Sequence, residues 1–245
     1  MTLRALFAAG ITAVAVSLAA CGPSATEGRT AYEAADDRAK GSADAPVTII
    51  EYASVACGGC AAFHEAAMPT IDEYIDNGDV RMVFREMITG QPELAIAGFL
   101  LANCAPDDQY FDVIDILFEQ QRAMYAAMQQ GRAQQQLQTI ARAAGFSNEE
   151  FRQCLSDEEG LQAIQRRNDA AADAGIGATP TFFVNGDRLD SIRDGQGVLV
   201  YAVDGEVLTD AEGPIPATFE GETFSRIIAY YKARVDGGAG DGGAG

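Results

Sequence analysis

Two cysteines, Cys57 and Cys60, stand three positions apart, directly after the strand-like run Val47–Ala53. Where a helix follows a strand, this Cys-x-x-Cys spacing brings both thiols within one turn, which suits reversible dithiol–disulfide chemistry. At the helix N-terminus, the first thiol meets unpaired N–H groups and the positive end of the helix dipole, which stabilise the attacking thiolate. The pair therefore predicts a thiol–disulfide oxidoreductase, with Cys57 as nucleophile and Cys60 as resolving thiol.

The same two cysteines could instead form half of a structural zinc site, which would need further ligands. The chain has a single histidine, His64, and no second Cys-x-x-Cys, so we do not favour zinc and expect no metal or organic cofactor. His64 falls one turn beyond Cys60. Two interpretations of it stay open: an electrostatic influence on the thiols, or a surface or partly buried helix residue without a role.

The beginning of the chain predicts export. Residues 1–20 carry Arg4 and then an apolar run, which is short and ends in small residues as cleaved signal peptides do. Leu18-Ala19-Ala20-Cys21 matches the bacterial lipobox, so the chain resembles a lipoprotein precursor whose Cys21 carries the lipid. The alternative is an ordinary signal peptide with a chance cysteine nearby. We expect a protein on the periplasmic side of the cell envelope, held to the membrane by its lipid.

Composition limits the remaining possibilities. The formal net charge of −19 argues against nucleic-acid binding, which needs a basic surface. Five cysteines in an exported chain fit an oxidising compartment. After Cys21 and the redox pair are assigned, Cys104 and Cys154 remain, and we expect them to form a structural disulfide. The alternative is two separate buried thiols, because sequence alone does not fix connectivity.

The chain between the two ends alternates between strand and helix patterns. A helix over 60–76, kinked at Pro69, and a strand over 80–85 would complete a βαβ unit with the first strand. Residues 92–174 are rich in Ala, Gln and Leu with helical periodicity, which predicts a block of several short helices. Strand character returns at 181–184, followed by the hairpin turn Asn185-Gly186, a second candidate hairpin over 198–208 and a closing helix over 222–235.

This order, followed by Ala178-Thr179-Pro180-Thr181-Phe182-Phe183-Val184-Asn185-Gly186, resembles the DsbA-like branch of the thioredoxin superfamily. Ala61-Ala62-Phe63-His64 and Phe84-Arg85-Glu86 add to the resemblance, which covers most of 44–186 and the last helix. The expected fold class is α/β, a thioredoxin fold with an inserted all-helical domain and an extra C-terminal β-hairpin. The expected divisions are a signal peptide (1–20), a flexible tether (21–42), thioredoxin-like parts (43–91 and 175–235), a helical insertion (92–174) and a disordered Gly-rich tail (236–245).

The resemblance also implies roles for individual residues. Pro180 would be cis and face the redox pair, and Thr179 would offer backbone hydrogen bonds to an extended substrate peptide. Glu51 would be a buried acid beneath the active site that accepts the proton of Cys60. The alternative for Glu51 is an exposed strand residue in a surface ion pair.

The expected partners are exported proteins that contain cysteines and a membrane protein that recycles the redox pair, with the protein itself a monomer. A reductase or isomerase role with the same pair is an alternative, although no obvious N-terminal dimerisation domain supports the isomerase. A non-enzymatic metallochaperone or binding module is another. Copper chaperones of this fold typically have a Cys-x-x-x-Cys spacing, which is absent here.

Gly58-Gly59 departs from the Pro-His pair of the strong oxidants in this family. Without an imidazole between the cysteines, we expect a pKa for Cys57 nearer the value of about 7 found in thioredoxin than the value of about 3.5 in DsbA. A less stabilised thiolate would make the disulfide a weaker oxidant.

Overall fold

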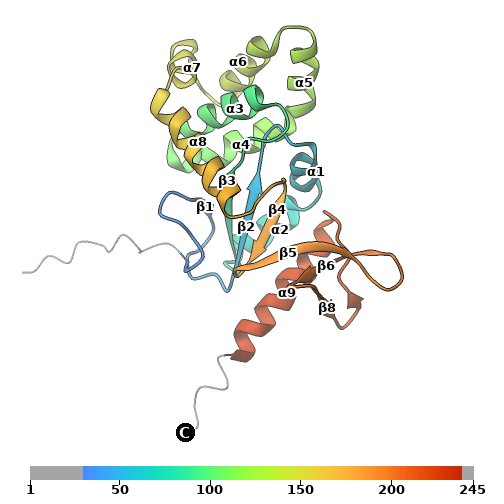
Figure 1. The fold of residues 1–245 in the computed structure, drawn as a ribbon. Coiled ribbons are helices and arrows are strands. Elements are labelled where there is room, and N and C mark those ends of the chain that lie inside the picture. The colour runs from blue at the N-terminus through green and yellow to red at the C-terminus, as the bar shows by residue number, and fades with distance from the viewer. Residues whose placement is uncertain (1–29, 239–245) are drawn as a thin grey trace, which may run out of the picture.

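A computed structural model of the 245-residue chain describes residues 30–238 (Figure 1). The expected signal peptide over 1–20, the expected lipidation site Cys21 and most of the expected tail lie outside the described residues. Among residues 30–238, none of the helices combines the length and the apolar character needed to cross a membrane.

A seven-stranded sheet, in the order β1-β3-β2-β4-β5-β6-β7, forms the centre of the molecule. Its strands are Arg38–Lys40 (β1), Val47–Ala53 (β2), Val80–Glu86 (β3), Thr181–Val184 (β4), Asp187–Arg193 (β5), Leu199–Val203 (β6) and Glu206–Val207 (β7). Strands β2 and β3 run parallel, and the other neighbours in this sheet are antiparallel. Two further short strands, Thr209–Asp210 (β8) and Gly213–Pro214 (β9), pair with each other.

Strand β2 is buried along almost its whole length, because helices cover both faces of the sheet at this point. The strand leads directly into α1 (Gly58–Ala66), which carries Cys60. The helix expected over 60–76 is in fact two helices, α1 and α2 (Met68–Asp76), separated at Ala67. Pro69 lies in the first turn of α2, where its missing N–H costs no hydrogen bond, so the chain breaks at this point rather than bending.

The block expected over 92–174 is helical and lies at one end of the sheet, beyond β3 and α1 (Figure 1). It contains α3 (Pro92–Cys104), a 3-10 turn (Asp107–Gln109), α4 (Tyr110–Glu119), α5 (Gln121–Gln129), α6 (Ala133–Ala143), α7 (Asn148–Leu155) and α8 (Glu158–Asp173). A disulfide between Cys104 and Cys154 joins α3 to α7. The core of this block continues into the strand-to-helix connection through Ala53, Val55 and Cys60.

The closing helix α9 (Gly221–Gly238) packs against α2 and the opposite part of the core. Phe224 and Ile227 of α9 meet Phe63 of α1 in one buried cluster with residues of β2 and β4. The helix reaches Gly238, so the first three residues of the expected disordered tail are helical. The sequence prediction underestimated the helix because glycine is a poor helix former, but the preceding turns pack well enough to carry it further.

The expected flexible tether ends earlier than predicted, because residues 30–42 belong to the fold. Strand β1 pairs antiparallel with the edge of β3. The carboxylate of Glu33 binds Arg81 at 2.9 Å, and that of Asp37 binds Arg85 at 2.7 Å. These acidic residues were expected to stay in solvent, but two arginines on the same strand hold them against the sheet, which satisfies their charge.

Beyond β4, the sheet is larger than the single extra hairpin expected. Strands β5, β6 and β7 continue it, and β8 and β9 add a separate ribbon. Asn185 and Asp204 have φ values of 48° and 52°, and a glycine with positive φ follows each. Two consecutive residues with positive φ are typical of the tight turns that match strand twist. Hairpins therefore form at the predicted turn Asn185-Gly186 and at Asp204-Gly205, which lies within the second candidate hairpin over 198–208.

Candidate active site

The redox pair lies where β2 passes into α1. Cys57 is the N-cap residue of α1, with an extended backbone, and Cys60 lies in the first turn. The two sulfurs are not bonded to each other, so the structure describes the reduced pair, and the two thiols form a hydrogen bond. Cys57 is half-buried, whereas Cys60 has no exposed surface. An incoming protein can therefore reach Cys57 but not Cys60.

The surroundings of Cys57 favour its thiolate. A hydrogen bond from the Cys60 thiol is the main cause that lowers the pKa of Cys57 to about 5, against the opposing effect of partial burial. The Thr179 hydroxyl and the backbone N–H groups of Cys60 and Gly59 add further hydrogen bonds. This pKa lies between the values of about 7 in thioredoxin and about 3.5 in DsbA, because these donors partly replace the ring missing between the cysteines.

Cys60 has the opposite environment. Burial is the main cause that raises the pKa of its thiol far above the ordinary value, and the hydrogen bond to Cys57 and the nearby charge of Glu51 act in the same direction. Cys60 thus keeps its proton until a base takes it. The two cysteines are only one turn of helix apart, but the pKa values of their thiols are shifted in opposite directions.

The loop before β4 covers the redox pair. The Thr179–Pro180 peptide bond is cis. The carbonyl oxygen of Thr179 lies 3.2 Å from Cys57 Sγ and accepts a hydrogen bond from the thiol form. A Cβ atom placed on Gly59 would lie 3.1 Å from the Pro180 ring, so the ring packs closely over the cysteine turn. On the other side, the hydroxyls of Thr179 and Thr89 are hydrogen-bonded at 2.6 Å.

Glu51 lies in β2 with no exposed surface. The alternative of an exposed strand glutamate is therefore wrong. Burial raises the pKa of its carboxyl group, and the neighbouring His64 acts against that rise. The Oε2 atom of Glu51 lies 2.8 Å from His64 Nε2.

His64 is also buried, with 8% of its side chain exposed. Its ring stacks on Phe118 of α4, with ring centres 4.0 Å apart. The second ring nitrogen, Nδ1, lies 3.8 Å from a carboxylate oxygen of Asp115. His64 is thus the partly buried helix residue that one of the two interpretations describes, and its ring lies next to the buried acid of the site.

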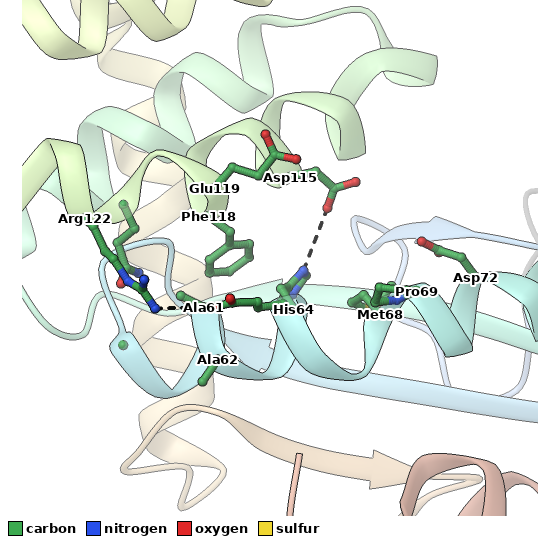
Figure 2. Close-up of a pocket in the computed structure, with 13 residues that line it drawn as sticks. Ala61, Ala62, His64, Met68, Pro69, Asp72, Asp115, Phe118, Glu119 and Arg122 are labelled. Carbon is green, nitrogen blue, oxygen red and sulfur yellow. Dashed lines mark hydrogen bonds and ion pairs between the residues drawn. The ribbon is translucent and has the colours of Figure 1, made fainter. Parts of the chain in front are cut away.

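A pocket of about 660 Å³ runs along α1 between that helix and α4 (Figure 2). His64, Asp115 and Phe118 form part of its wall, and Gly58, next to Cys57, also lines it. Figure 2 shows the dashed contact from the His64 ring to Asp115 on the facing helix. The pocket therefore brings solvent close to the buried Glu51–His64 pair from the side of the helical insertion.

Two residues of the helical insertion, not foreseen from the sequence, fix the connection that carries Cys57. The Gln121 amide donates hydrogen bonds to the carbonyl oxygens of Val55 at 2.8 Å and Cys57 at 3.0 Å. The Tyr125 hydroxyl donates to the carbonyl oxygen of Ala56 at 2.6 Å. Their partners are backbone atoms 64 to 69 positions earlier, so no local motif could reveal them.

Comparison with known proteins identifies the family of this chain and proteins that share its fold. The family model described as Thioredoxin matches residues 33–197. Among solved structures, alpha-DsbA1 of Wolbachia pipientis superposes with a TM-score of 0.65 at 23% identity, over 84% of this chain and 96% of that one. The chain belongs to the thioredoxin family. Oxidised BdbD of Bacillus subtilis shares the fold of this thioredoxin-family protein with a TM-score of 0.58 at 19% identity, over 80% of this chain and 93% of that one.

Curated relatives extend the comparison in sequence. A Rickettsia conorii protein named as a protein-disulfide oxidoreductase is 33% identical over 157 residues, which are 62% of this chain and 54% of the relative. Disulfide bond formation protein D of Bacillus subtilis is 27% identical over 159 residues, 63% of this chain and 70% of the relative. The thioredoxin-family chain thus spans about half the length of the Rickettsia relatives that it matches.

Proposed function

We propose that this protein is a thiol–disulfide oxidoreductase that exchanges disulfides with cysteine-containing proteins through Cys57 and Cys60. The observation that carries the proposal is the contrast within the pair: an accessible Cys57 with a pKa of about 5 beside a buried, protonated Cys60. A pair of cysteines with only a structural role would need no such difference in accessibility and pKa. The names of the Rickettsia and Bacillus relatives support the same activity.

The cycle follows from this contrast. A substrate thiolate attacks Cys57 of the Cys57–Cys60 disulfide, a bond between the substrate sulfur and Cys57 forms, and Cys60 leaves as a thiolate that takes up a proton. A second substrate thiolate then attacks the substrate sulfur, the new substrate disulfide forms, and Cys57 leaves as a thiolate. To restore the disulfide, Cys57 attacks a disulfide of a recycling partner, and Cys60 loses its proton and attacks Cys57.

Two neighbours serve this cycle in our proposal. Glu51 takes the proton of Cys60 when that thiol must attack, since it is the buried carboxylate whose charge already acts on Cys60. Thr179, beside cis Pro180, presents its backbone to an extended substrate chain next to Cys57. The disulfide between Cys104 and Cys154 supports the helical insertion and takes no part in exchange.

The location and partners are part of the same proposal. The protein acts on the periplasmic side of the cell envelope, attached to the membrane by a lipid on Cys21, and works as a monomer. Its substrates are exported proteins with cysteines, and a membrane redox protein recycles the pair. A net charge of −19 suits an exported surface that stays in solution and does not bind nucleic acid.

A reductase or isomerase would use the same residues in another net direction. A metallochaperone is less well supported, because residues 30–238 contain no cluster of three or more His, Cys, Asp or Glu side chains able to hold a metal. In addition, the Nε2 atom of His64 faces Glu51.

Trapping tests the proposal. A Cys60→Ser variant should accumulate mixed disulfides between Cys57 and proteins of an envelope extract, which reducing agent releases, and a Cys57→Ser variant should accumulate none. Equal capture by both variants, or no capture by Cys60→Ser, would contradict disulfide exchange. Copper or zinc retained by wild type through dialysis and lost in both variants would favour the metallochaperone instead.

A further inference from the structure

Two buried side-chain atoms lack a hydrogen-bond partner among the described residues, and they belong to neighbouring groups: Glu51 Oε1 and His64 Nδ1. The other polar atoms of the same two side chains, Glu51 Oε2 and His64 Nε2, bind each other at 2.8 Å. Leaving a buried polar atom without a partner is costly, and here two occur at the ends of one ion pair. Such an arrangement suits groups that exchange protons at these two atoms, of which His64 Nδ1 has only the longer ion-pair contact to Asp115, at 3.8 Å.

Glu51 Oε1 and His64 Nδ1 face different surroundings. Glu51 is placed under the redox pair, where its charge acts on both Cys57 and Cys60. His64 Nδ1 is turned to the pocket between α1 and α4, 3.8 Å from Asp115, whose side chain is 46% exposed (Figure 2). A buried carboxylate, a buried imidazole and a solvent-exposed carboxylate thus follow one another from the thiols to the pocket.

Packing alone does not account for a histidine at this position. Phe118 stacks on its ring, and Phe63 and Phe84 contact it edge-on. An apolar side chain would fill this aromatic niche without the cost of burying a charge. The polar character of His64 therefore serves Glu51 and the pocket.

We propose that His64 is a positioning residue that holds the Glu51 carboxylate beneath the redox pair and links it to the pocket at Asp115, so that oxidation of Cys60 releases a proton there. This inference rests on the proposed exchange activity and adds to it the route by which the proton leaves.

The protons balance over one cycle. In the reduced protein, Glu51 is a carboxylate and His64 an imidazolium with protons on both nitrogens. When Cys60 attacks, its S–H bond breaks and an O–H bond forms on Glu51. The imidazolium has then lost its counter-charge, so its Nδ1–H bond breaks and the proton passes to Asp115 or to pocket water. When a substrate later opens the disulfide, the Cys60 thiolate recovers the proton from Glu51, and His64 regains one from the pocket.

The charges around His64 are compatible with this order of proton transfers. Burial opposes its protonation, but Glu51 from β2 and Asp115 from α4 outweigh that effect and raise the pKa of His64 to about 9. On its own helix, the titratable groups facing the pair are Cys57 and Cys60. Glu65 and Asp72 from α1 and α2, and Glu119 and Arg122 across the pocket, line the same space. These charges favour the imidazolium form of His64, the form from which the proposed proton transfer starts.

The reaction with Ellman's reagent, a small aromatic disulfide, gives a separate kinetic phase for each of the two thiols. Attack by Cys57 on this small aromatic disulfide releases one coloured thiolate, and attack by Cys60 on the resulting mixed disulfide releases a second. In wild type, the rate of the second phase should stay nearly level across neutral pH, because Glu51 removes the proton internally. In His64→Gln the second-phase rate should fall about tenfold at neutral pH and rise about tenfold per pH unit. Without His64, burial raises the pKa of Glu51 unopposed, so Glu51 no longer serves as the base and hydroxide must replace it.

Two pocket variants test the route itself. Asp115→Asn should slow the second phase about threefold at neutral pH and leave the first phase unchanged, since it removes the acceptor next to Nδ1. Glu119→Gln removes an equal charge from the same pocket wall and should match wild type in both phases. Because Asp115 is exposed, its variant can carry the test even where His64→Gln does not fold.

A level pH profile in folded His64→Gln would overturn the inference, as would equal second-phase rates in Asp115→Asn and Glu119→Gln. Failure of the proposed function has a different signature. In that case wild type itself shows no second phase, or Cys60→Ser shows the same second phase as wild type.

Discussion

At the scale of the residue, environment makes two equal thiols unequal. Cys57 collects hydrogen bonds at the start of a helix, and Cys60, three positions later, is enclosed by the core. The donors to Cys57 include backbone N–H groups that any sequence would supply at a helix N-terminus. The two glycines between the cysteines therefore matter less for the Cys57 thiolate than their departure from the Pro-His pattern indicates.

The lowered pKa of Cys57 has a consequence for stability. Its folded pKa of about 5 is below its ordinary value of 9.0, so the thiolate stabilises the reduced fold fully above pH 9 and loses this effect as pH falls through about 5. The oxidised protein lacks this titration. We expect the stability of the reduced form relative to the oxidised form to rise between pH 5 and 9, measured as the difference between their urea midpoints. A difference that is constant with pH would contradict the assigned pKa.

At the scale of the element, the connection between β2 and α1 is held from both sides. On one side the Ser54 hydroxyl donates to the carbonyl oxygen of Thr89 and accepts from the backbone N–H of Ala56. On the other, Gln121 and Tyr125 of α5 bind the carbonyl oxygens of the same connection. The helical insertion thus positions Cys57 without contributing a reacting group.

Replacement of Gln121 tests this role. A Gln121→Leu variant leaves the buried carbonyl oxygen of Val55 without its donor, which should cost about 1–3 kcal/mol in the free energy of unfolding. The matched control is Gln129→Leu, an exposed position near the end of the same helix, where we expect a change within about 0.5 kcal/mol. Urea unfolding of both variants gives the comparison. Equal stabilities would show that α5 does not hold the connection.

At the scale of the whole molecule, one buried carboxylate joins the sheet to the helical insertion. Glu86, at the end of β3, accepts hydrogen bonds from Asn103 at 2.7 Å and Tyr110 at 3.0 Å, and its other oxygen pairs with Arg167 of α8. The described part of the helical insertion is also tied internally by its disulfide. The pocket beside His64 lies between these two halves, so their relative position sets its shape.

The disulfide should contribute to the stability of the whole molecule. It closes a loop of 50 residues, for which removal should cost roughly 2–4 kcal/mol. We expect Cys104→Ala combined with Cys154→Ala to lower the urea midpoint accordingly. Both proteins in this comparison should also carry Cys57→Ser and Cys60→Ser, so that the redox pair cannot form new disulfides. An unchanged midpoint would mean that the bridge adds nothing beyond packing.

Local patterns in the sequence were sufficient to predict much of the fold. The boundaries of β2 and β4 follow from short apolar runs, and the hairpin turns follow from Asn-Gly and Asp-Gly, because backbone preference and side-chain period act over a few residues. The same holds for the placement of Cys57 and Cys60 at a helix start. The pairing of β1 with β3 was not predicted. The acidic residues before and beside β1 are held by Arg81 and Arg85, which are far along the chain, so no local pattern indicates the contact.

The sequence by itself determined which elements form, and which residue types could take part in disulfide chemistry. Only the tertiary structure decided how far those residues differ from one another: that Cys57 is half-buried and Cys60 fully enclosed, and that Glu51 contacts His64. It also decided that Gln121 holds the turn between β2 and α1. The physical reason is that burial and charge depend on neighbours brought from far along the chain, and those neighbours leave no mark in the local pattern.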